Sequence, residues 1–297
     1  MKYVLFKRAY GSSQANHLFD FELEDLIRDF CFAEQFYFLA GHAVGKINDK
    51  QELVYPWVGE NDIAGDEEGD KLYARLNTPS SIIYSSKHLA SFIVAQNGRR
   101  IYKLSLPDGY LLRQLTGDNC IKAIDHFFSK TSETTQGVTD IALSDKGIYW
   151  TSGILNRCFF LGSDGVSNYV GDGYSDYTLS NNAVHTRLKN PSGVFYFNDI
   201  LYLCDDNCCI RTISKNGSSL FAGQPSVRQI TDGPFGTNRI HSPSKIKGCK
   251  STFYFIDNGK VRMFTPSNAN IVTLTRFKNV VAIEVDDNRN LYVLEKR

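Results

Sequence analysis

The pattern of hydrophobic and polar positions repeats along the chain. A short apolar segment, centred on an aromatic residue and followed by a polar turn, occurs six times, at 36–41, 91–96, 148–153, 201–206, 253–258 and 291–296. The aligned aromatic residues are Tyr37, Phe92, Tyr149, Tyr202, Tyr254 and Tyr292. Successive aromatics lie 38–57 residues apart, and a strand-rich repeat of this kind is typical of β-propeller blades.

Each copy lies within a longer unit that predicts four strands. A first strand precedes the aromatic segment at 27–34, 80–87, 138–145, 193–199, 244–250 and 280–287. A third strand follows it, as at 99–105, 208–214 and 260–265, and a fourth often ends in glycine, as at 53–59, 111–117, 166–171 and 219–223. Four short strands joined by tight turns predict one antiparallel blade.

The last unit has only its first two strands, and the N-terminal segments 2–9 and 17–24 resemble the missing third and fourth. Closing the ring in this way leaves no open radial edge, which would favour aggregation. We therefore predict an all-β fold, a single six-bladed β-propeller over 1–297. Its blades are expected near 27–59, 80–117, 138–171, 191–223 and 244–277, with the sixth formed by 280–297 and 2–24.

Several segments resemble the NHL-repeat family, in which an Asp-Gly loop precedes an Ala-Arg-Leu-Asn-x-Pro sequence. They are DEEGDKLYARLNTPSSI at 66–82, TRLKNPSGV at 186–194 and TDGPFGTNRIHSPSKI at 231–246. The turn in CDDNCCIRTISKNG at 204–217 is similar to the family's Asp-x-x-Asn-x-Arg-Ile pattern, one residue short. The resemblance implies six blades and a recognition function, with protein or single-stranded RNA partners. Related six-bladed propellers are metal-dependent lactonases and lyases, and fold alone does not choose between these functions.

Four of the predicted connections between blades are long, at about 59–79, 117–137, 171–191 and 223–243. They should emerge together on one face, and loops of this length in a compact domain are usually functional. Within them, Arg75, Arg187 and Arg239 occupy equivalent positions and are predicted to brace the loops against Asp66, Asp172 and Asp232. The candidates for partner contact are Tyr174, Tyr177, Phe235, His185, Phe127 and Phe128, the last two on a predicted amphipathic helix at 118–130.

An enzyme of the lactonase type needs several acidic or amide side chains at the inner strands, converging on a metal ion. The corresponding positions are Asp29, Ser81, Asp140, Gly193, Lys245 and Ala282. Two acids and a lysine make a poor cage, and Lys245 is expected to neutralise Asp29 or Asp140. The sequence therefore predicts no metal, no cofactor and no catalytic residue.

Charge and cysteine usage narrow the functional classes. The formal net charge is +1, and the acidic first long loop opposes binding of phosphate chains, although single-stranded RNA remains an alternative. No apolar run is long enough for a membrane-spanning helix, the N-terminus lacks a signal peptide pattern, and seven scattered cysteines favour a reducing, cytoplasmic setting.

Cellular or viral origin stays open. The leading hypothesis is a non-catalytic protein-binding subunit of a larger assembly. The alternatives are a metal-dependent lactonase or lyase and an RNA-binding protein, and a small-molecule ligand also stays open.

Overall fold

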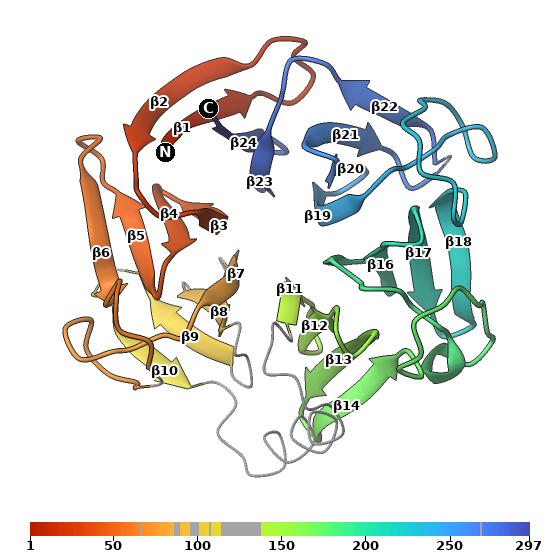
Figure 1. The fold of residues 1–297 in the computed structure, drawn as a ribbon, viewed down its shortest axis with the longest axis horizontal. Helices are drawn as coiled ribbons and strands as arrows, with labels where there is room; N and C mark the ends of the chain where they lie inside the picture. The colour runs from red at the N-terminus through yellow and green to blue at the C-terminus, as the bar shows by residue number, and fades with distance from the viewer. Residues whose placement is uncertain (66, 86–89, 96–100, 107, 114–137, 268) are drawn as a thin grey trace.

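The computed structural model describes residues 1–65, 67–85, 90–95, 101–106, 108–113, 138–267 and 269–297. The strands pair into six four-stranded antiparallel sheets arranged as a ring around a central axis (Figure 1). The predicted all-β propeller of four-stranded antiparallel sheets is confirmed. Within the described residues, no helix has the length and apolar character needed to cross a membrane.

Within a sheet the strands follow one another from the axis to the rim, so alternate turns emerge on opposite faces of the ring. The N-terminal half contains β1 (Lys2–Arg8), β2 (Asn16–Glu22), β3 (Ile27–Ala33), β4 (Gln35–Ala40), β5 (Ala43–Ile47), β6 (Leu53–Gly59), β7 (Pro79–Ser85), β8 (Ala90–Ala95), β9 (Ile101–Ser105), β10 (Leu111–Arg113), β11 (Val138–Leu143) and β12 (Ile148–Ser152). The C-terminal half contains β13 (Arg157–Gly162), β14 (Gly165–Val170), the short 3-10 helix η1 (Ala183–His185), β15 (Gly193–Phe197), β16 (Ile200–Asp205), β17 (Cys209–Ser214), β18 (Gly217–Gly223), β19 (Pro243–Cys249), β20 (Thr252–Asp257), β21 (Lys260–Phe264), β22 (Ile271–Leu274), β23 (Val280–Val285) and β24 (Leu291–Lys296).

The two ends of the chain meet within one sheet. Its strand order is β2-β1-β24-β23, so the N-terminal strands complete the sheet that the C-terminal strands begin (Figure 1). The backbone N–H of Arg297 donates to the carbonyl of Lys2 over 2.9 Å. The ring is therefore closed by hydrogen bonds between strands.

The hydrophobic core is divided among the junctions between neighbouring sheets. Among the described residues, the buried apolar side chains form six clusters, and each cluster joins two adjacent sheets. Trp150 and Phe159, for example, stack with ring centroids 5.5 Å apart in the cluster shared by the β7–β10 and β11–β14 sheets. Burying one such side chain contributes about 1.5–3 kcal/mol, so the sheets stabilise one another around the ring.

A β-bulge interrupts most of the inner strands at the same level. One extra residue lies near the start of β3, β7, β11, β19 and β23, just before or at the position that faces the axis. A bulge re-aims the side chains beside it. The bulges lie beside the inner-strand residues Asp29, Ser81, Asp140 and Lys245, which meet at the axis.

Candidate functional site: the central channel and the loop-bearing face

Four of the inner-strand residues converge in the channel. Lys245 Nζ lies 2.9 Å from Asp29 Oδ2 and 3.6 Å from Asp140 Oδ1. Ser81 Oγ lies 2.8 Å from one oxygen of each carboxylate. Backbone amides complete the shell, because Ile82 donates to Asp29 and Val194 donates to Asp140. The predicted ion pair of Lys245 is therefore present.

A second lysine adds to this charge balance. Lys247 Nζ lies 3.6 Å from Asp140 Oδ1 on the side away from solvent. Burial alone would raise the pKa of Asp140, but Lys247 and Lys245 hold it below its usual value. Burial would likewise lower the pKa of Lys247, but Asp140 and Asp29 raise it. Two ammonium groups thus neutralise two carboxylates.

Glu284 completes the cluster from β23. Burial raises the pKa of Glu284 to about 7, against the opposing effect of Lys247. Its Oε2, Asp29 Oδ1 and Lys247 Nζ are enclosed and have no hydrogen-bond partner within the described protein atoms. The centre of the ring is therefore filled by paired charges.

This arrangement differs from a metal centre. Calcium and magnesium sites gather several oxygen ligands around one point, whereas here an ammonium nitrogen occupies the position between the two carboxylates. The described residues contain no group of three or more His, Cys, Asp or Glu side chains placed to hold a metal ion. At the equivalent position of β15, Gly193 leaves no room for a side chain, because a Cβ there would lie 2.8 Å from the Lys245 amide nitrogen.

The long connections emerge on one face of the ring, and buried arginines of the third strands secure two of them. Arg211 on β17 is fully buried, lies 2.6 Å from Asp205 and donates to the Thr178 carbonyl in the connection 171–192. Asp205 in turn accepts hydrogen bonds from the amides of Lys189 and Asn207. The pair therefore ties the connection to the body of the sheet.

Arg262 on β21 repeats the arrangement one sheet further along. It is fully buried, lies 2.7 Å from Asp257 and donates to the carbonyls of Thr231 and Arg239 in the connection 224–242. It also reaches Asp232 over 3.1 Å. Charge-assisted hydrogen bonds are about twice as strong as neutral ones, so these arginines hold the connections firmly.

Of the three predicted arginine–aspartate pairs, only one has the predicted partner among the described residues. Arg187 does contact Asp172, over 3.1 Å. Arg75 instead contacts Glu60 over 2.8 Å, and Asp66 lies outside the described residues. The pairing of Arg239 with Asp232 is wrong, because Asp232 binds the buried Arg262 while Arg239 donates to the carbonyls of Gly236 and Asn238. The Arg239 side chain caps its own turn.

The predicted contact residues divide into two groups. Tyr174 and Phe235 project outward with 68% and 55% of their surface exposed, and His185 on η1 is also exposed. Tyr177 folds back, with its ring 4.2 Å from the Arg211 guanidinium, so it covers the buried ion pair. Phe127, Phe128 and the predicted helix at 118–130 lie outside the described residues.

Among the described residues of the connections, the most exposed large apolar side chains are two that the sequence analysis missed. Leu72 and Tyr73 are adjacent and are 71% and 74% exposed. They lie on a helical turn in which the amides of Tyr73 and Ala74 donate to the Asp70 carbonyl. The equivalent turn of the connection 224–242 carries Phe235. The only signal in the sequence was the apolar pair in GDKLYARLN.

The turn that carries Leu72 and Tyr73 is anchored on both sides. Ala74 and Leu76 are fully buried after it. Before it, Gly69 forms a two-way backbone bridge with Leu111, each amide donating to the other's carbonyl over 2.8 Å. A side-chain pair held outward by a pinned backbone loses little conformational entropy on binding.

Exposed apolar side chains concentrate on the loop-bearing face. Of the twelve large hydrophobic residues exposed in the described part of the chain, seven lie on connections from a fourth strand to the next first strand: Leu26, Ile63, Leu72, Tyr73, Tyr174, Leu179 and Phe235. Single exposed apolar residues are ordinary, so the adjacent pair Leu72 and Tyr73 is the more informative feature.

In sequence comparisons, no protein-family model and no curated protein matches the chain. Solved structures match over nearly its whole length. It is similar to an auxiliary nutrient binding protein from Bacteroides thetaiotaomicron, with 13% identity, a TM-score of 0.59 and coverage of 99% of this chain and 76% of that one. It is similar to a chain of the nidogen/laminin complex, with 12% identity, a TM-score of 0.55 and coverage of 99% and 85%. It is also similar to a streptogramin B lyase, with 15% identity, a TM-score of 0.52 and coverage of 97% and 85%. At these identities the likeness shows that the chain shares the β-propeller fold with binding proteins and with an enzyme.

Proposed function

We propose that the protein is a non-catalytic docking module that binds another protein through its loop-bearing face. The observation that carries the proposal is the pair Leu72–Tyr73, which projects almost fully into solvent from a turn anchored by buried neighbours. Tyr174 and Phe235 are exposed on two other connections, between β14 and β15 and between β18 and β19. Aromatic and large apolar side chains on rigid supports are the usual anchors of protein interfaces.

The charge around the pair indicates the chemistry of the partner. The connection 60–78 contains Glu60, Asp62, Asp66, Glu67, Glu68 and Asp70 against Lys71 and Arg75, a net charge of −4 in the sequence. The complementary surface is a basic rim around an apolar pocket. Acidic side chains here would repel a nucleic acid backbone, so a protein partner is favoured over RNA.

The central channel supports the non-catalytic part of the proposal. The two aspartates there are paired with lysines, an arrangement that does not gather oxygen ligands around a metal ion. We infer that the chain is a divergent member of the six-bladed NHL-like propellers, which the Arg-Leu-Asn-x-Pro segment at 75–79 supports. The nidogen/laminin likeness is compatible with protein docking on this fold.

Cysteine chemistry supports placing the protein in a reducing compartment. The six described cysteines are free thiols, and five of them are buried. Burial raises the pKa of Cys209 to about 12, which suppresses the reactive thiolate.

A comparison of two surface variants tests the proposal. The double variant Leu72→Ser/Tyr73→Ser removes the apolar tip, and Leu53→Ser/Tyr10→Ser removes two exposed apolar residues on the opposite face, where Tyr10 lies beside Asn290 of the β23–β24 turn. Wild type and the second variant should recover the same stoichiometric partner from native extract, and the first should lose it. Binding should weaken as salt rises, because an acidic loop faces a basic surface. Equal recovery by both variants would show that the loop face is not the interface.

A further inference from the structure

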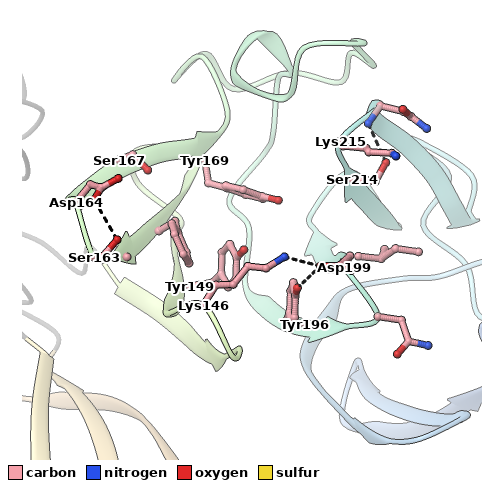
Figure 2. Close-up of a pocket in the computed structure, with 15 residues that line it drawn as sticks. Lys146, Tyr149, Ser163, Asp164, Ser167, Tyr169, Tyr196, Asp199, Ser214 and Lys215 are labelled. Atoms are coloured by element: carbon pink, nitrogen blue, oxygen red, sulfur yellow. Dashed lines mark hydrogen bonds and ion pairs between the residues drawn. The ribbon is translucent and has the colours of Figure 1, made fainter.

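A cleft lies on the face opposite the long connections, between the β11–β14 and β15–β18 sheets. Its volume is about 1050 Å³, and turns at the ends of both sheets surround it. The β11–β12 turn contributes Lys146, the β13–β14 turn contributes Asp164, the β15–β16 turn contributes Asp199 and the β17–β18 turn contributes Lys215 (Figure 2). None of these residues belongs to the loop-bearing face.

Aromatic rings from four neighbouring strands form the inner wall of the cleft. Tyr149 lies at its base, 4% exposed, and stacks on Tyr196 with centroids 5.4 Å apart and an interplanar angle of 16°. Phe160 and Tyr169 lie 4.6 Å and 4.9 Å from the same ring. Such a wall offers flat apolar surface with phenol groups at its edge.

A hydrogen-bonded ion pair between exposed side chains links the two sheets beside the cleft. Lys146 Nζ lies 2.7 Å from Asp199 Oδ1, and the Tyr196 hydroxyl donates to Asp199 over 2.8 Å (Figure 2). Asn198 and Asp199 both have positive φ, as a two-residue hairpin turn requires, and this turn directs Asp199 towards Lys146. The aromatic wall and the polar rim are thus positioned together.

We infer that this cleft is a binding site for a neutral oligosaccharide. Its four charged side chains are two lysines and two aspartates, so the site has no net charge to select a polyanion or a polycation. Serine hydroxyls and the amides of Asn198 and Asn216 supply both donors and acceptors, which match sugar hydroxyl groups. The apolar C–H faces of a sugar ring stack on aromatic side chains, and the wall provides that surface.

The size of the depression indicates a ligand of more than one sugar unit. An adjoining hollow of about 720 Å³ shares Lys146, Gly162, Tyr196 and Asn198 with the cleft and continues to Ser85 and Lys103 of the β7–β10 sheet. Pockets for compact ligands are typically about 300–1,000 Å³. A short chain of neutral sugars fits the extended shape, and the site does not depend on the docking function proposed above.

A titration of the purified full-length protein tests the inference. The ligands are neutral hexasaccharides (gluco-, manno-, xylo- and chito-oligosaccharides), and binding is measured by calorimetry and saturation-transfer NMR. At least one member should bind, and Tyr196→Ala should weaken it about tenfold. Because Tyr196 also contributes to packing, Ser167→Tyr serves as a second variant, which fills the cleft from an exposed position without removing a packed side chain; it should abolish binding. Leu72→Ser/Tyr73→Ser and Tyr110→Ala should bind as wild type.

Three results would overturn the assignment of the cleft as a site for neutral sugars. Absence of binding by the whole panel, or binding that both cleft variants leave unchanged, would refute the site. Binding of oligogalacturonate or of a proline-rich peptide in place of neutral sugars would assign the cleft to a different ligand class and would also overturn the inference. The two proposals can fail separately. Absent protein docking with intact sugar binding would refute only the docking proposal, and absent sugar binding with intact docking would refute only this inference.

Discussion

At the residue scale, the central cluster shows why Asp140 is required. Its carboxylate is fully buried, contacts Ser81 and the Val194 amide, and lies 3.6 Å from both lysines. Asp140→Asn leaves a buried ammonium group without its counter-charge, so we expect a loss of about 3–5 kcal/mol in the free energy of unfolding. Urea denaturation measures this loss. The exposed Asp164→Asn should change it by less than about 0.5 kcal/mol, and comparable effects of the two variants would contradict the account.

Glu284 gives the cluster a pH dependence. Its pKa rises from 4.5 to about 7 on folding, so between these pH values the folded protein holds a proton that the unfolded chain has lost. The free energy of unfolding must therefore fall as pH rises through this range. We expect Glu284→Gln to lose this component of the slope, worth about 1–3 kcal/mol between pH 4.5 and 7.5. Parallel curves for wild type and variant would be inconsistent with a raised pKa.

At the element scale, the third-strand arginines control the connections. Arg262→Met leaves Asp257 buried without its partner and removes the donors to Thr231 and Arg239. We expect destabilisation by about 3–5 kcal/mol and faster amide exchange in 224–242. Arg187→Met, which breaks a half-exposed pair, should cost less than about 1 kcal/mol. If amide exchange in 224–242 is unchanged in Arg262→Met, the bracing role is wrong.

The strands could be predicted from the sequence because each carries an aromatic or alternating apolar pattern that only a sheet junction can bury. The inner-strand set Asp29, Ser81, Asp140 and Lys245 was also predictable, since equivalent strand positions meet at the axis. The partners of Arg239 and Asp232 were not, because third-strand Arg262 competes for the same acid. Nor was the cleft, whose rim residues Lys146, Asp199 and Lys215 are ordinary turn residues until the fold places them together.

At the scale of the whole molecule, the closed ring makes the position of the chain ends unimportant. Arg297 and Lys2 are hydrogen-bonded neighbours. A circular permutant that joins 297 to 1 through a short glycine linker and opens the exposed β5–β6 turn at 49–51 should keep the wild-type circular dichroism spectrum and remain monodisperse. Deleting 1–22, which removes β1 and β2, should instead give an aggregating protein with an open sheet edge. An aggregated permutant would argue against closure by these strands.

The central claim is that the loop-bearing face holds a partner against Leu72 and Tyr73. The most direct measurement places a photo-crosslinking benzoylphenylalanine at position 73 in one sample and at position 10, beside the β23–β24 turn on the opposite face, in another. After irradiation in native extract, the account predicts one discrete crosslinked protein from position 73 and none from position 10. Absence of a crosslink at position 73, or the same product from both positions, would contradict it.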